Sequence, residues 1–401
     1  MPDVHASSSR AVSECSLAAP RIRFAERDTN GFRRLLNARV EAHFARSGKS
    51  RLAGPALHAK AAVLLAVAAG FYAAMLLGGW GAWATLGCAL VYGVAVLLLG
   101  MNIAHDAAHL AVTGRARADM AIQRVLFALL GVDGYLWRMR HDGSHHVFPN
   151  VNGCDIDIDE NRFLRLSPNH ARRPWHRFQH LYAPVLYMLT LSDSVFSNDL
   201  KYLFKKDLAN MRAITHSRSQ VALFFAGKLF YLVLSIVLPL MFIRLPWWQV
   251  LLGYAAVNAL VSLVFVFLLI GTHFSTFAEF PPLGADGRLE SSWAAHALST
   301  SLDWAPQSRL ASLIAGGANC HAAHHLFPRV SHVHYRAITK IVKETAAECG
   351  VRYNETTFFG MVASHFAHLR RMGNDGAPPL LLRVGIRVPP RLVFGVYRAL
   401  Y

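Results

Sequence analysis

Four long apolar segments constrain the fold of this chain more than any other feature. They cover residues 57–78, 82–101, 221–243 and 248–271. Each reaches the roughly 20 residues that a helix needs to cross the hydrocarbon core of a bilayer. Only 16% of the residues are charged, whereas a soluble domain carries about 25%. We therefore predict an all-α integral membrane protein whose four transmembrane helices form two hairpins.

The distribution of positive charge predicts the orientation. The formal net charge is +17, and lysine and arginine gather in residues 10–51, 115–218 and 329–398, while the links inside the two hairpins carry only Arg244. Basic residues stay on the cytoplasmic side of a membrane. We expect both termini in the cytoplasm, and the membrane explanation of the charge argues against a nucleic-acid partner. Five scattered cysteines without a CxxC pair indicate a reducing compartment.

The segments outside the four spans predict a domain with two tails. Residues 1–30 are polar and lack periodicity, so we expect a disordered N-terminus. The main domain covers residues 31–372 and begins with a predicted membrane-surface helix at 31–47. The long loop between the hairpins contains short apolar runs at 120–132 and 182–191, which we expect to form interfacial or re-entrant helices. Residues 373–401 are a C-terminal tail.

Nine of the 21 histidines lie in patterns that favour metal binding. Histidines three or four residues apart on a helix share one face, where their rings can converge on an ion. A single HxxxH pair is weak, but three such clusters in one chain are a strong signal. The nine are His105 and His109 in "HDAAH", His141, His145 and His146 in "RHDGSHH", His321, His324 and His325 in "HAAHH", and His273 after the fourth span.

Topology supports this interpretation, because even-numbered spans emerge on the same side of the membrane. His105 follows the second span and His273 follows the fourth. All nine histidines can therefore meet at one membrane face. Nine ligands exceed the six that one octahedral ion accepts, so we predict two ions, each with an open position. Imidazole suits iron, copper, nickel and zinc, and two irons beside a bilayer would indicate oxygen activation.

The remaining polar residues near these clusters have weaker assignments. Candidates to orient the imidazoles are Asp106, Asp142, Asp155 and Asn319. Asp157 and Asp159 are equally well explained as solvated loop carboxylates. We interpret the other histidines as structural: His5, His43, His58, His170, His176, His180, His216, His296, His332, His334, His365 and His368.

With these motifs, residues 30–372 resemble the membrane fatty acid desaturases. The three histidine boxes of that family match the clusters above, and His273 matches a further ligand. The stretches "HHVFPNVNGCDIDI" and "HHLFPRVSHVHY" resemble bacterial linoleoyl-CoA and front-end desaturases. The resemblance implies four spans under a cytosolic helical cap, with a diiron site (Fe2+/Fe3+) at the mouth of an apolar tunnel. It also implies dioxygen as co-substrate, an acyl-CoA or membrane-lipid acyl chain as substrate, and a bacterial inner membrane.

The sequence departs from the family pattern at several positions. His321 begins the third box where front-end relatives often have glutamine, Asp142 replaces a common asparagine, and Leu269 occupies a position that is asparagine in the animal acyl-CoA enzymes. The regiochemistry therefore stays open. The HPGG motif of a fused cytochrome domain is absent, so we expect a separate electron donor such as a ferredoxin, a rubredoxin or a cytochrome with its reductase.

Three other functions compete with desaturation. The histidine boxes would equally serve an acyl-chain or lipid hydroxylase or ketolase on the same scaffold. A membrane zinc hydrolase is a weaker alternative, because it needs only about three protein ligands and no electron donor. A non-enzymatic metal- or lipid-binding protein is the weakest, because every ligand box is intact.

Overall fold

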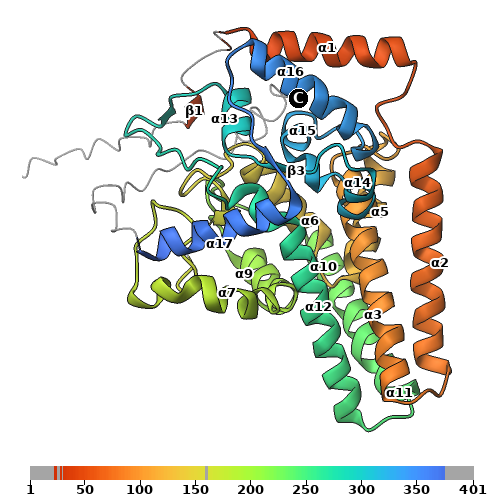
Figure 1. Cartoon of the computed structure of the whole chain (residues 1–401). Helices are drawn as coiled ribbons and strands as arrows, with labels where there is room; N and C mark the ends of the chain where they lie inside the picture. The colour runs from red at the N-terminus through yellow and green to blue at the C-terminus, as the bar shows by residue number, and fades with distance from the viewer. Residues whose placement is uncertain (1–21, 25–27, 29, 159–160, 375–401) are drawn as a thin grey trace, which may run out of the picture.

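The computed structural model describes residues 22–24, 28, 30–158 and 161–374. Four of its helices are long and apolar enough to cross a membrane: Pro55–Leu77, Ala82–Ala108, Arg218–Phe242 and Trp247–His273. Figure 1 shows these helices extending to one side, while the other helices gather as a cap at their opposite end. The predicted helical membrane fold with four spans is therefore confirmed.

The second and fourth spans continue further than hydropathy alone predicts. Helix α3 (Ala82–Leu99) runs through a π-helical turn, Gly100–Ala104, into α4 (His105–Ala108). Helix α12 (Trp247–His273) ends on a histidine. The expected ends at 101 and 271 are therefore too early, because the helices stay intact where they leave the apolar layer and enter the cap. His105 and His273 lie on the spanning helices themselves.

The first span is α2 (Pro55–Leu77), and the third consists of α10 (Arg218–Leu232), a π-helical turn (Val233–Val237) and α11 (Leu238–Phe242). Between the hairpins, α5 (Ala116–Leu129) and α6 (Gly134–Arg140) form a pair bent by 109°. This bend fits the re-entrant alternative for residues 120–132. The second short run becomes α7 (Gln179–Tyr187) and α8 (Thr190–Asp193), whose Leu181 and Val185 are exposed.

The cap combines segments from both ends of the chain. Its other helices are α1 (Phe32–Ser47), α9 (Asp199–Phe204), α13 (Trp293–Ser299), α14 (Arg309–Ala315), α15 (His321–Leu326), α16 (Tyr335–Glu348) and α17 (Phe358–Asn374). Two short parallel strand pairs join β1 (Arg23–Phe24) to β2 (Arg288–Leu289), and β3 (Asp303–Trp304) to β4 (Glu355–Thr356).

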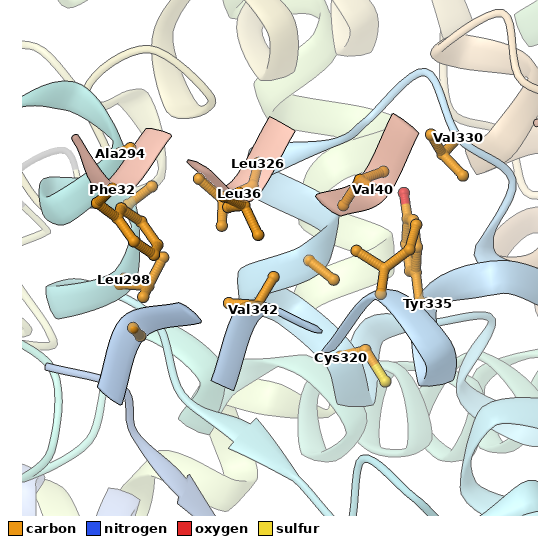
Figure 2. Close-up of a cluster of buried hydrophobic side chains, with 14 of the residues drawn as sticks. Phe32, Leu36, Val40, Ala294, Leu298, Cys320, Leu326, Val330, Tyr335 and Val342 are labelled. Atoms are coloured by element: carbon orange, nitrogen blue, oxygen red, sulfur yellow. The ribbon is translucent and has the colours of Figure 1, made fainter. Parts of the chain in front are cut away.

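Helix α1 belongs to the cap and not to the membrane surface. Its apolar residues Phe32, Leu36 and Val40 recur at helical spacing and are buried against α13, α15 and α16 (Figure 2). Arg39 on the same helix pairs with Glu348 of α16 at 2.7 Å. The expectation of a membrane-surface helix at 31–47 is wrong, because the apolar face that lipid would cover already packs on protein.

The predicted tails fall mainly outside the described residues. Residues 1–21 and 375–401 are not among them. Within the segment predicted to be disordered, residues 1–30, the described Arg23 and Phe24 form β1. Asp28 accepts hydrogen bonds from the backbone N–H groups of Arg33 and Arg34 at the start of α1.

The packing of α1 generates a test. Leu36→Ala removes a side chain that is 1% exposed, and we expect it to lower the free energy of unfolding by about 2–5 kcal/mol. Asn37→Ala, on the exposed face of the same helix, is the matched control. Thermal unfolding of both variants in detergent measures the difference. Equal melting temperatures for the two variants would contradict the assignment of α1 to the cap core.

Candidate metal centre

All nine predicted histidines converge where the second and fourth spans enter the cap. Seven of them expose 5% or less of their surface: His109, His145, His146, His273, His321, His324 and His325. They come from four separate parts of the chain, namely the second span, the turn after α6, the end of α12, and α15. Burial of so many imidazoles in one place is costly unless their ring nitrogens find partners.

The histidines divide into two groups. The first histidine group consists of His105, His109, His141 and His324, and the second consists of His145, His273, His321 and His325. Within each group, one ring nitrogen from every member lies within 4.8 Å of the others. Two nitrogens on opposite sides of one ion are about 4.2 Å apart. Each group therefore has nearly the dimensions of a single coordination sphere.

The second group shows the tightest geometry. The Nε2 atom of His273 lies 2.7 Å from Nε2 of His321 and 3.0 Å from Nε2 of His325, and the last two atoms are 3.3 Å apart. Nitrogens bound about 2.1 Å from one ion at right angles are roughly 3 Å apart. Three mutually facing Nε2 atoms cannot all be satisfied by protons shared between pairs, whereas one cation satisfies them together. The donor set fits a transition-metal ion.

The first group contains buried ring nitrogens for which the described residues provide no hydrogen-bond partner. Among the described residues, Nε2 of His109 and Nε2 of His324 are buried without a hydrogen bond. The ring centroids of His105 and His324 are 4.5 Å apart, and those of His109 and His324 are 5.1 Å apart. A buried imidazole nitrogen without a partner is costly, and a bound cation would remove that cost.

His146 lies between the two groups because the second box is not α-helical. Residues His141–His145 form a π-helical turn, and the backbone N–H of His146 donates to the carbonyl of His141, five residues earlier. This turn brings Nε2 of His146 to 2.9 Å from Nε2 of His141. The ring of His146 also stacks on His325 at 4.5 Å. The expected pairing of His141 with His145, four residues apart, is also present, with ring centroids 5.4 Å apart, and the π turn adds a closer pair five residues apart.

Electrostatics favour neutral rings at most positions. Burial, followed by the neighbouring imidazoles, holds the pKa of His141, His146, His321, His324 and His325 well below its ordinary value. A neutral imidazole offers a lone pair to a metal. These rings are therefore in the protonation state that ligation needs.

His145 differs from the other rings. Burial lowers its pKa, but the carboxylates of Asp155 and Asp157 outweigh burial and raise it to about 9. The same carboxylates would stabilise any cation held beside His145. The second group thus combines four imidazoles with nearby negative charge.

Polar partners orient the rings of the second group. Nδ1 of His145 lies 3.2 Å from both carboxylate oxygens of Asp155, and Nδ1 of His273 lies 2.9 Å from the carbonyl oxygen of Thr300. When Nδ1 carries the proton and donates, Nε2 is left free to bind a metal. In both rings Nδ1 therefore faces an oxygen acceptor, which directs Nε2 into the group.

Asp142 and Asp106, two other candidates for orienting the imidazoles, contact different histidines. Asp142 lies 3.3 Å from Nδ1 of His109 and accepts a hydrogen bond from Arg138. Asp106 instead accepts from the hydroxyl of Ser331 and lies 3.0 Å from Nδ1 of His332. The structure gives Asp106 no hydrogen bond to a histidine of either group, so it braces the cap segment after α15.

Asn319 does not contact a cluster histidine through any hydrogen bond that the described residues form. Its amide donates to the carbonyl of Ala305 and to the hydroxyl of Ser312. The expectation that it orients an imidazole is therefore wrong. Its amide instead supports the turn that precedes α15.

Sequence reasoning missed several residues of the site. Trp137 stacks on His141 with ring centroids 4.1 Å apart, and its position one helical turn before His141 was a usable signal. Asp157 was not missed: the sequence left its role open, and the structure shows that it can join His141 and His145 around an ion. The Thr300 carbonyl is a backbone group, so no side-chain motif in the sequence indicates it. Asp159 and His5 lie outside the described residues.

The histidines interpreted as structural lie outside both groups in the part of the chain that is described. Nε2 of His296 lies 2.9 Å from the carbonyl oxygen of Pro149. His365 donates from Nδ1 to the carbonyl of Phe274 and accepts from the hydroxyl of Tyr187. These two rings hold backbone next to the site without facing it.

An apolar cavity of about 410 Å³ lies between the spans. Its lining includes Trp83, Val96 and Leu130, and no histidine of either group. Val96 is nine residues before His105 on the same helix, which corresponds to roughly 13 Å. We expected an apolar tunnel that opens at the metal site. The cavity lies between the spans instead, and its lining does not reach the histidines.

Comparison with known proteins gives consistent results. The fatty acid desaturase family model matches residues 81–357. The chain is 28% identical to the sn-1 linoleoyl-lipid 6-desaturase of Arthrospira platensis, over 85% of this chain and 92% of that protein. It is 29% identical to the enzyme of the same name from Synechocystis sp., over 89% and 99%, and 30% identical to the acyl-lipid (8-3)-desaturase of Physcomitrium patens, over 88% and 74%.

The division into two groups generates a test with adjacent residues. His324 belongs to the first group and His325 to the second. We expect His324→Ala and His325→Ala each to lose one of two bound ions, but from different sites. Metal analysis of purified protein gives the stoichiometry, and the spectrum of the remaining ion distinguishes the sites.

His58→Ala is the control, because His58 is exposed on α2. It should keep the full metal content. If either box variant also kept the full content, or if both variants left the same spectrum, the division into two groups would be wrong.

Proposed function

The chain belongs to the fatty acid desaturase family, and we propose that it is a membrane acyl-lipid desaturase that uses dioxygen and a pair of histidine-bound irons. One observation carries this proposal. Two groups of four imidazoles lie side by side where the second and fourth spans enter the cap. A structural zinc site would need only one group, usually with thiolates.

The relatives favour a lipid-linked substrate. Their names give linoleoyl-lipid and acyl-lipid desaturation. A chain attached to a membrane lipid is already confined to the bilayer beside the four spans. We therefore place a membrane-lipid acyl chain ahead of acyl-CoA as the substrate.

The chemistry divides between the ions and the protein. Iron bound by His105, His109, His141 and His324, and by His145, His273, His321 and His325, would supply the oxidising power of dioxygen. His146 lies between these sets and is the ninth ligand in the proposal. The overall reaction converts –CH2–CH2–, O2, two electrons and two protons into –CH=CH– and two water molecules.

The side chains provide a dry, fixed site. Seven of the nine histidines are almost completely buried, and an apolar cluster that contains Leu97, Met101 and Trp304 lies between the cap and the spans. Water is excluded from such a cluster, and aliphatic surface is favoured there. Polar contacts from Asp155 and Thr300 hold two of the rings, so that the groups are formed before substrate arrives.

The orientation and the electron donor are part of the same proposal. Basic residues on the cap side favour a cytoplasmic cap, with both termini and the site on that side of a bacterial inner membrane. The two electrons would come from a separate ferredoxin, rubredoxin or cytochrome with its reductase.

Expression in a bacterial host with few unsaturated lipids tests the function. We expect a new acyl chain that has lost two hydrogens, detected by mass spectrometry of lipids after hydrolysis. Its double-bond position follows from derivatisation. Protein with His325→Ala should accumulate in the membrane at the level of the parent and give no new chain.

Other results would change the assigned reaction. A chain with one added oxygen would identify a hydroxylase. Zinc without iron in active protein would contradict the oxidative reaction. Desaturation would also be contradicted if the parent and His325→Ala gave the same lipids with each class of electron donor supplied.

A further inference from the structure

We propose that Asn150 is a positioning residue that couples the rings of His145 and His273, two ligands of the second histidine group. This inference rests on the proposed function, because it treats that group as a metal site. Asn150 lies four residues after His146 and is 0% exposed. It contacts neither ring, and it acts through the groups that hold them.

The side chain of Asn150 fixes the end of the fourth span. Its amide nitrogen donates to the carbonyl of His273 at 3.1 Å and to the carbonyl of Glu279 at 2.9 Å, and it lies 3.5 Å from the carbonyl of Thr300. The Thr300 carbonyl also accepts from Nδ1 of His273 at 2.9 Å. The amide therefore reaches both the backbone of the ligand and the acceptor that sets the angle of its ring.

The backbone of Asn150 fixes the second box. Its N–H donates to Asp155 at 2.9 Å. Asp155 in turn holds Nδ1 of His145, with both of its oxygens at 3.2 Å. One residue thus binds the orienting partner of each ligand, across 123 positions of sequence between Asn150 and His273.

The conformation at Asn150 explains why asparagine stands there. Its φ angle is +60°, a left-handed conformation that asparagine and glycine adopt more readily than other residues. This conformation turns the backbone N–H towards Asp155 while the amide reaches the end of α12. Only asparagine combines the turn with a side chain that donates at this length.

The role predicts a selective effect on metal binding. Residues that orient metal ligands typically contribute 10–100-fold to metal affinity. The hydrogen bonds of Asn150 reach the partners of the second group, and none of them reaches a member of the first group. Loss of the amide should therefore weaken one site and leave the other unchanged.

Cobalt titration of metal-depleted protein tests this role. Asn150→Gly keeps the left-handed backbone and its N–H but removes the amide. Asn150→Asp keeps the shape but replaces the donor with a carboxylate that faces carbonyl oxygens. We expect the parent to bind Co2+ in two steps seen by visible absorption, and one step to weaken by about 10–100-fold in both variants.

Asn354→Ala is the matched control. Asn354 is also a buried cap asparagine, and its amide donates to the carbonyls of Leu298 and Ser301 rather than to either ligand's partner. It should lower the melting temperature without weakening either Co2+ step. The positioning role would be overturned if both Co2+ steps weakened alike or if neither weakened. It would also be overturned if the control behaved like the Asn150 variants.

The outcomes separate this inference from the proposed function. If the parent protein binds no Co2+, the metal site itself is wrong, and the proposed function fails with it. If the parent binds Co2+ in two steps and the Asn150 variants match it in both, the proposed function stands and only the role of Asn150 is refuted.

Discussion

The structure depends on the gathering of nine imidazoles, seven of them buried, at the edge of a membrane. An apolar surrounding keeps most of these rings neutral, and their ring nitrogens face one another at distances near 3 Å. Two such nitrogens can share one proton in a hydrogen bond, but the three Nε2 atoms of His273, His321 and His325 cannot all do so at once. A shared cation would resolve this conflict for each group, so the same feature that would destabilise a metal-free fold marks where the structure could hold a metal. The rest of the cap can be understood as the scaffold that keeps these rings together.

The scaffold holds the histidines together because they sit on elements that pack against one another. The second and fourth spans carry His105 and His273 on unbroken helix, so the bilayer itself fixes their height. Helix α15 supplies three further rings and packs among α13, α16 and α1 in one apolar cluster. Asp155 and Asn150 then tie the second box to the end of α12. Metal affinity and cap stability are therefore expected to depend on each other.

Much of this arrangement could be predicted from the sequence, because it follows from local patterns. Apolar length gave the four spans, and the parity of the spans brought the nine histidines to one face. Features that depend on tertiary contacts could not be predicted. The apolar stripe of α1 looks the same whether lipid or protein covers it. The π-helical turn at His141–His145 has no sequence signature, so the 2.9 Å approach of His141 and His146, which were placed in one cluster, could not be predicted. Backbone acceptors such as the Thr300 carbonyl, and the left-handed Asn150, become visible only in three dimensions.

The central claim is that two ions occupy two separate histidine groups beside the bilayer. The most direct measurement is an anomalous difference map, collected at the iron absorption edge from crystals of the purified protein. The account predicts two iron peaks, one within bonding distance of His105, His109, His141 and His324, and one within bonding distance of His145, His273, His321 and His325. A single peak, peaks that belong to zinc, or histidine rings turned away from any metal would contradict it.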